Sequence, residues 1–126
     1  MKKILVVDDS ETVRRQVRQA LAGGGYTIIE CVDGLEGLET IRATDDLGLV
    51  LCDVDMPRMN GLEMVTELHR LGNAVPILML TTEGDPALVQ RARQVGCKGW
   101  IVKPFKPQLL ASAVTKFVPA DGGGTR

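Results

Sequence analysis

The sequence is poor in the residues that build metal and disulfide frameworks. Only one histidine, His69, occurs among the 126 residues, and three cysteines, Cys31, Cys52 and Cys97, are scattered without a Cys-x-x-Cys pair. This odd, dispersed set argues against a disulfide framework and a zinc site, so we expect buried or half-buried thiols in a reducing cytoplasm. A Ser-His-Asp triad would depend on His69 alone, which we expect on a helix surface.

The sequence also lacks a charge excess and a long apolar run. Lysine and arginine total 15 against 16 acidic residues, so the formal net charge of −1 gives no basic surplus for direct nucleic-acid binding. Asp8 and Asp9 interrupt the first apolar run before the ~7 residues that a signal peptide needs. The stretch 74–80 is far shorter than the ~20 residues that cross a bilayer. We therefore expect a cytoplasmic protein without membrane insertion.

What the chain contains fits one domain. Its 126 residues are 44% hydrophobic and 25% charged, which is enough for one core but not for two. Residues 120–126, ADGGGTR, have no apolar face, so we expect a domain of residues 1–119 followed by a flexible glycine-rich tail or a linker stub. If the chain is complete, no effector domain follows, and any output has to pass through a protein contact.

Five short segments rich in valine, isoleucine and leucine predict β-strands. They are residues 3–7, 26–31, 47–52, 76–80 and 99–102. Several are nearly continuous apolar runs, as in strands covered on both faces, and helical patterns such as Val13 and Val17 lie between them. Strict alternation implies parallel strands with right-handed crossovers, hence a three-layer α/β sandwich. On the first helix, we expect Arg14, Arg15 and Arg18 to be solvated.

Charged and hydroxyl side chains follow the predicted strands. Asp8 and Asp9 come after the first strand, Asp53 after the third, Thr81 after the fourth and Lys103 after the fifth. Since the carboxyl ends of parallel strands meet at one edge of the sheet, these residues are expected to converge there. Close carboxylates repel one another by about 4 kcal/mol per pair at an effective dielectric constant near 20, so the site requires a cation.

The oxygen-rich donor set favours Mg²⁺, which typically binds one or two carboxylates, several waters and a phosphate oxygen. With a divalent ion and Lys103 present, an aspartate can attack phosphorus and form an aspartyl phosphate. Taken singly, each residue has a plainer explanation: Asp8 or Asp9 as a helix cap, Thr81 as a turn residue and Lys103 as a solvated charge. Their common position at strand ends favours a phosphoryl-accepting site.

Several motifs resemble the receiver domain of response regulators, over residues 2–118. They are Asp8-Asp9-Ser10, the segment DVDMPRMNG from Asp53 to Gly61, Thr81 and Lys103-Pro104-Phe105. The resemblance is to the single-domain, chemotaxis-type (CheY-like) members. It implies a (βα)5 doubly wound, flavodoxin-like parallel sheet in the strand order 2-1-3-4-5, an order that the periodicity alone does not predict.

The resemblance implies a metal and phosphorylation site. Asp53 would be the phosphoacceptor, Asp9 and Asp53 would bind Mg²⁺ directly, and Asp8 would act largely through water. The backbone carbonyl of Asp55 would complete the protein ligands. Asp55 and Glu83 also lie at the two positions that in this family tune the access of the hydrolytic water.

The resemblance further implies a conformational switch. Thr81 would hydrogen-bond the bound phosphoryl group, Lys103 would pair with it, and the peptide bond before Pro104 would be cis. Trp100 stands where the family usually has a tyrosine or phenylalanine that changes rotamer on activation. The larger indole sets this chain apart from that pattern.

The implied activity is a signalling switch that catalyses only its own phosphorylation and slow dephosphorylation. The phosphoryl group would come from a histidine kinase or a small phosphodonor. Output would pass to a flagellar-motor protein or another motility or signalling target, over a surface that includes Lys98, Trp100 and Phe105. We expect a monomer or a weak dimer.

Two other classes of protein share part of the pattern. A phosphatase or phosphotransferase of the haloacid-dehalogenase type also uses an Asp-x-Asp motif, as in Asp53-Val54-Asp55, but places it after the first strand of a longer chain. A flavodoxin-like redox module needs a glycine- and hydroxyl-rich loop after that strand. Here Asp8-Asp9 would repel the flavin phosphate unless a metal intervened.

Overall fold

The computed structural model describes residues 2–82 and 86–120. Five parallel strands form one sheet in the order β2-β1-β3-β4-β5, which confirms the predicted topology. The strands are β1 (Lys2–Val7), β2 (Tyr26–Cys31), β3 (Leu47–Asp53), β4 (Ile77–Thr81) and β5 (Gly99–Val102). Their bounds agree with the predicted segments to within one residue. Glu83 and residues 121–126 of the expected tail lie outside the described residues.

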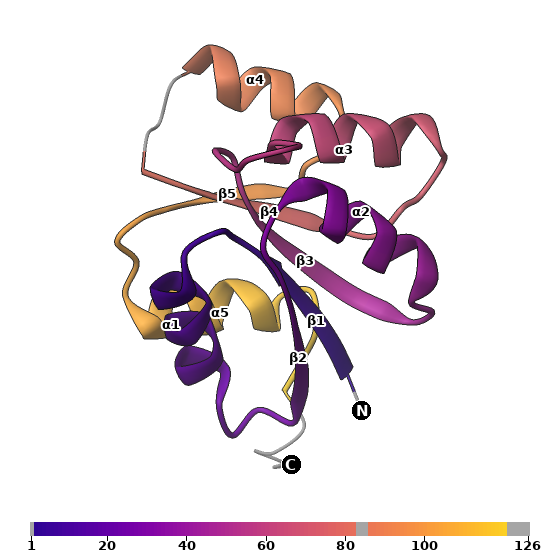
Figure 1. The fold of residues 1–126 in the computed structure, drawn as a ribbon. Helices are drawn as coiled ribbons and strands as arrows, with labels where there is room; N and C mark the ends of the chain where they lie inside the picture. The colour runs from indigo at the N-terminus through magenta and orange to yellow at the C-terminus, as the bar shows by residue number, and fades with distance from the viewer. Residues whose placement is uncertain (1, 83–85, 121–126) are drawn as a thin grey trace.

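Five helices cover the two faces of the sheet. They are α1 (Glu11–Leu21), α2 (Gly34–Ala43), α3 (Gly61–Arg70), α4 (Pro86–Gln94) and α5 (Pro107–Thr115). Helices α1 and α5 lie on one face and α2, α3 and α4 on the other, so the three-layer sandwich is also confirmed (Figure 1). Within residues 2–82 and 86–120, none of the helices has the length and apolar character that crossing a bilayer requires.

Polar caps begin the first three helices, in the connections that follow the carboxyl ends of β1, β2 and β3. The Ser10 hydroxyl accepts a hydrogen bond from the Val13 amide at 3.3 Å, and the Asp33 carboxylate accepts one from Glu36. Asn60 forms a reciprocal capping box at the start of α3. Because each helix begins in the connection that leaves the carboxyl end of a strand, three helix starts come to the same edge of the sheet as the strand ends.

The core has two halves, one on each face of the sheet. In β1 and β3, alternate side chains enter opposite halves: Leu5 and Val50 pack beneath α2, α3 and α4, whereas Ile4 and Leu49 pack beneath α1 and α5. Burial on both faces explains the continuous apolar runs of these strands. The three cysteines are buried and free, as expected.

Two adjacent leucines of α5 test the packing of the core half that lies beneath α1 and α5. Leu110 is fully buried and Leu109 is 59% exposed. We expect Leu110→Ala to lower the free energy of unfolding by about 2–5 kcal/mol because it leaves a cavity. Leu109→Ala, the matched control, should change it by no more than about 0.5 kcal/mol. Urea unfolding followed by circular dichroism measures both values, and equal losses would contradict the assigned packing.

Candidate functional site

Three carboxylates meet at the carboxyl edge of the sheet. Strands β1 and β3 are neighbours and pair Val7 with Cys52, so the next residues, Asp8 and Asp53, emerge side by side. Carboxylate oxygens of Asp8, Asp9 and Asp53 all lie within 4.8 Å of one another. Asp8 and Asp53 are buried, whereas Asp9 is exposed. The cluster therefore combines two enclosed carboxylates with one, that of Asp9, that is exposed to solvent.

Lys103 brings the balancing cation from β5. Its Nζ lies 2.8 Å from Asp8 Oδ2 and 3.1 Å from Asp53 Oδ1. The Lys103 backbone amide donates a 2.7 Å hydrogen bond to the carbonyl of Thr81 at the end of β4, and the Lys103–Pro104 peptide bond is cis. One ammonium group facing three carboxylates leaves the cluster with an excess of negative charge.

The electrostatics of the cluster oppose ionisation of Asp53. Burial raises the pKa of the Asp53 carboxyl, the Asp8 charge raises it further, and Lys103 only partly offsets both effects. Burial pulls the pKa of Lys103 down, but its hydrogen bond and attraction to Asp8 outweigh burial, so that the pKa is raised. A divalent cation bound among these oxygens would relieve the excess charge. The donor set therefore fits Mg²⁺.

The structure places the other expected site residues at the same edge or close to it. Thr81 is buried at the end of β4 and pairs in register with Val102, the residue before Lys103. Asp55 is exposed in the loop between Asp53 and α3. Trp100 is half-buried in β5, and its indole N–H is enclosed without a hydrogen-bond partner among the described residues.

Arg14 is a correction to the sequence analysis, which expected a solvated side chain. Its side chain is only 11% exposed, because Nη1 donates to the backbone carbonyl of Asp8 at 2.6 Å and Nε donates to Glu30 Oε1 at 3.0 Å. Arg18 also pairs with Glu30, at 2.6 Å. The one signal in the sequence was Glu30 itself, an acid within the otherwise apolar end of β2. Arg14 thus ties the loop that carries Asp8 to the edge strand.

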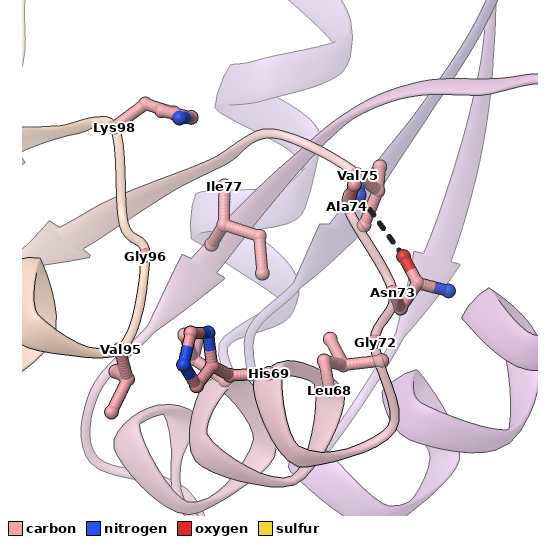
Figure 2. A pocket seen from close by; sticks show the side chains of 11 residues that line it. Leu68, His69, Gly72, Asn73, Ala74, Val75, Ile77, Val95, Gly96 and Lys98 are labelled. Carbon is pink, nitrogen blue, oxygen red and sulfur yellow. Dashed lines mark hydrogen bonds between the residues drawn. The ribbon is translucent and has the colours of Figure 1, made fainter.

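A separate cavity lies at the opposite end of the sheet. It has a volume of about 370 Å³ and lies between the last turn of α3 and the segment that leads into β5 (Figure 2). His69, Lys98 and Gly96 border it, with Leu68 and Ile77 among its apolar side chains. His69 is exposed there, as expected, and its position at the end of α3 separates it from the carboxylates.

Comparisons with known proteins agree with the geometry of the site. The family described as "Response regulator receiver domain" matches residues 4–115. The chain is 41% identical over 111 residues to the chemotaxis protein CheY1 of Helicobacter pylori, covering 86% of this chain and 90% of that protein. The structure of the chemotaxis response regulator CheY4 of Vibrio cholerae superposes with a TM-score of 0.85 at 37% identity, covering 94% of this chain and 99% of that one.

A second similar structure contains a bound partner. It is a CheX–CheY complex with beryllofluoride and Mg²⁺ from Borrelia burgdorferi. The TM-score is 0.85 at 26% identity, and the match covers 91% of this chain and 87% of that one.

The raised pKa of Asp53 predicts a pH-dependent gain in stability when the charge is removed. The folded state holds the Asp53 proton more tightly than the unfolded state, whose pKa is near 3.8, so ionisation above that pH disfavours folding. With EDTA present, Asp53→Asn should unfold at higher urea than the wild type at pH 7, and the difference should shrink as the pH falls toward 4. A difference independent of pH would contradict the assignment.

The burial of Arg14 predicts unequal roles for two neighbouring arginines. Arg14→Ala leaves the Asp8 carbonyl without this donor and should lower the free energy of unfolding by about 1–3 kcal/mol. Arg15 is exposed on the same helix. Arg15→Ala should change the free energy of unfolding by no more than about 0.5 kcal/mol. Chemical denaturation of the two variants under identical conditions measures both free energies of unfolding. Equal losses in the two variants would refute the role given to Arg14.

Proposed function

Because this chain belongs to the response regulator receiver domain family, we propose that Asp53 accepts a phosphoryl group from a histidine kinase in a two-component signalling system. Residues 1–119 would form the receiver domain. The observation that carries this proposal is the buried contact of Asp53 with Asp8 and Lys103 at the carboxyl edge of the sheet. An acid placed there lies beside the Lys103 ammonium group and within reach of a divalent cation.

The proposed metal site uses oxygen atoms from two loops. Asp9 and Asp53 would bind Mg²⁺ directly, Asp8 would act largely through water, and the Asp55 carbonyl would complete the protein ligands. Bound Mg²⁺ would supply the positive charge that neutralises the phosphoryl oxygens. The clustering of three carboxylates around a single lysine supports this assignment, since their repulsion would fall when a divalent ion binds.

The proposed transfer is a direct displacement at phosphorus. A carboxylate oxygen of Asp53 forms the new bond to phosphorus while the bond from phosphorus to the donor atom breaks, and the donor keeps that electron pair. The Lys103 ammonium group, already 3.1 Å from Asp53 Oδ1, would then pair with a phosphoryl oxygen. Water would later attack the aspartyl phosphate, and Asp55 and Glu83 would tune its access.

The proposed switch links the phosphoryl group to β5. The Thr81 hydroxyl would hydrogen-bond the phosphoryl group and draw its loop inward, and Trp100 would change rotamer in response. Two features support a second rotamer for Trp100. Its indole N–H is buried without a described partner, which is unfavourable in the present position, and β5 lies next to β4.

We propose a chemotaxis or motility role and an output by protein contact, in the cytoplasm, as a monomer or a weak dimer. The names of the Helicobacter and Vibrio relatives support the pathway. The output surface would include Lys98, Trp100 and Phe105, beside the exposed apolar side chains of Val102 and Leu109. The family match does not favour the alternative of a haloacid-dehalogenase-type phosphatase.

Direct phosphorylation tests the proposed function. After incubation with Mg²⁺ and acetyl phosphate, intact-protein mass spectrometry should show the addition of one phosphoryl group to the wild type. Asp53→Asn should show none, because an amide does not attack phosphorus, and Asp9→Ala should show a loss of at least about 10-fold because a direct metal ligand is missing. Glu67→Gln, which neutralises a half-buried acid on α3 that pairs with Arg70, is the matched control and should behave like the wild type.

The same variants can be followed by Trp100 fluorescence with beryllofluoride and Mg²⁺. We expect a change in the wild type and none in Asp53→Asn. Undiminished phosphorylation of Asp53→Asn would show that another residue is the acceptor.

A further inference from the structure

The loop between β3 and α3 is tied to the start of α2 by two contacts. Arg58 Nε donates a 2.7 Å hydrogen bond to Asp33 Oδ2, within an ion pair. The Gly34 amide donates a 2.9 Å hydrogen bond to the carbonyl of Met59. Both contacts lie a few residues beyond Asp55, the proposed carbonyl ligand. They join this loop to the segment that follows β2, a strand that contributes no carboxylate to the acid cluster.

Asp33 is a fixed anchor and not a mobile surface acid. Its side chain is 4% exposed, and its second oxygen, Oδ1, accepts a 2.9 Å hydrogen bond from the Glu36 amide as the cap of α2. Its hydrogen bond with Arg58 holds the pKa of the Asp33 carboxyl below its usual range, with support from the Glu36 amide. Exposed ion pairs generally contribute little, but here the anion is already immobile, so less side-chain freedom is lost on pairing.

The backbone of the loop depends on being held from outside. Arg58 has φ +65°, a left-handed conformation that a long side chain disfavours. A Cβ atom on Gly34 would lie 2.3 Å from the Met59 carbonyl oxygen, and one on Gly61 would lie 2.1 Å from the Asp53 carbonyl oxygen. The left-handed backbone conformation of Arg58 persists only where the surrounding structure holds it in place. The loop is therefore held against α2 at one point and against the end of β3 at another.

We propose that Arg58 is a positioning residue for the metal site: its ion pair with Asp33 holds the β3–α3 loop in the conformation that binds Mg²⁺ tightly. This inference rests on the proposed function, because it assigns to Arg58 the role of holding the Asp55 carbonyl in place. Without the ion pair, the loop samples other conformations, and binding of Mg²⁺ has to select the competent one. The affinity for Mg²⁺ then falls in proportion to the fraction of molecules whose loop is in the competent conformation.

Calorimetric titration with MgCl2 measures the predicted effect. Supports behind metal ligands typically contribute 10- to 100-fold to affinity, and Arg58 acts through the backbone, so we expect Arg58→Ala to raise the Kd for Mg²⁺ by about 10-fold. Asp33→Asn keeps a good helix cap but removes the charge and should also raise the Kd. The Kd of the double variant for Mg²⁺ should be no higher than that of the more affected single variant, because the two side chains act as one unit.

Arg70→Ala is the matched control. Arg70 is 67% exposed and also pairs with a carboxylate, that of Glu67, but its pair lies on α3 alone. The Kd of the Arg70→Ala variant for Mg²⁺ should equal that of the wild type. Thermal unfolding in EDTA separates a structural role from positioning: a lower unfolding temperature with an unchanged Kd for Mg²⁺ would overturn the inference. If Arg58→Ala does not fold, Asp33→Asn, which also removes the ion pair, provides the same comparison.

The wild type and Asp9→Ala distinguish failure of this inference from failure of the proposed function. Absence of Mg²⁺ binding by the wild type would overturn both. Binding by the wild type that is lost in Asp9→Ala but unchanged in Arg58→Ala and Asp33→Asn would leave the proposed function standing and refute the role of Arg58.

Discussion

Repulsion among Asp8, Asp9 and Asp53 is the constraint on which the site depends. Their oxygens lie within 4.8 Å of one another, two of the three residues are buried, and Lys103 supplies one positive charge between Asp8 and Asp53. In a pocket screened from water, such repulsion is stronger than at a surface. The site is therefore stable enough to form and sufficiently anionic to favour a divalent cation.

The fold resists this repulsion by holding the acids on a rigid edge. Asp53 ends a strand that is buried on both faces, and Asp8 follows another. The two loops that leave these strands are each tied to carboxylates at the end of β2 or just after it, one through Arg14 and the other through Arg58. The edge strand thus supports the site without contributing a ligand to it.

The sequence predicted the strands and helices from local signals, whereas the strand order came from the resemblance to receiver domains. Runs of valine, isoleucine and leucine marked the strands, and helical patterns such as Val13 and Val17 marked the segments between them. The convergence of Asp8, Asp53 and Lys103 followed from a rule about parallel sheets, so it needed no coordinates. Arg14 was predicted wrongly. A charged residue on an amphipathic helix usually faces solvent, and its partner Glu30 is on a different element.

The sequence by itself determined the alternation of strands and helices and the identity of the acids at the strand ends, because hydrophobic periodicity is a property of residues that are close together in the chain. Only the tertiary structure decided that Arg14 is buried beneath the Asp8 loop, that Arg58 reaches Asp33 across 25 positions of the chain, and that the indole N–H of Trp100 is enclosed. The physical reason is that the energy of an ion pair or of a buried donor depends on distance and on exclusion of water, and packing sets both.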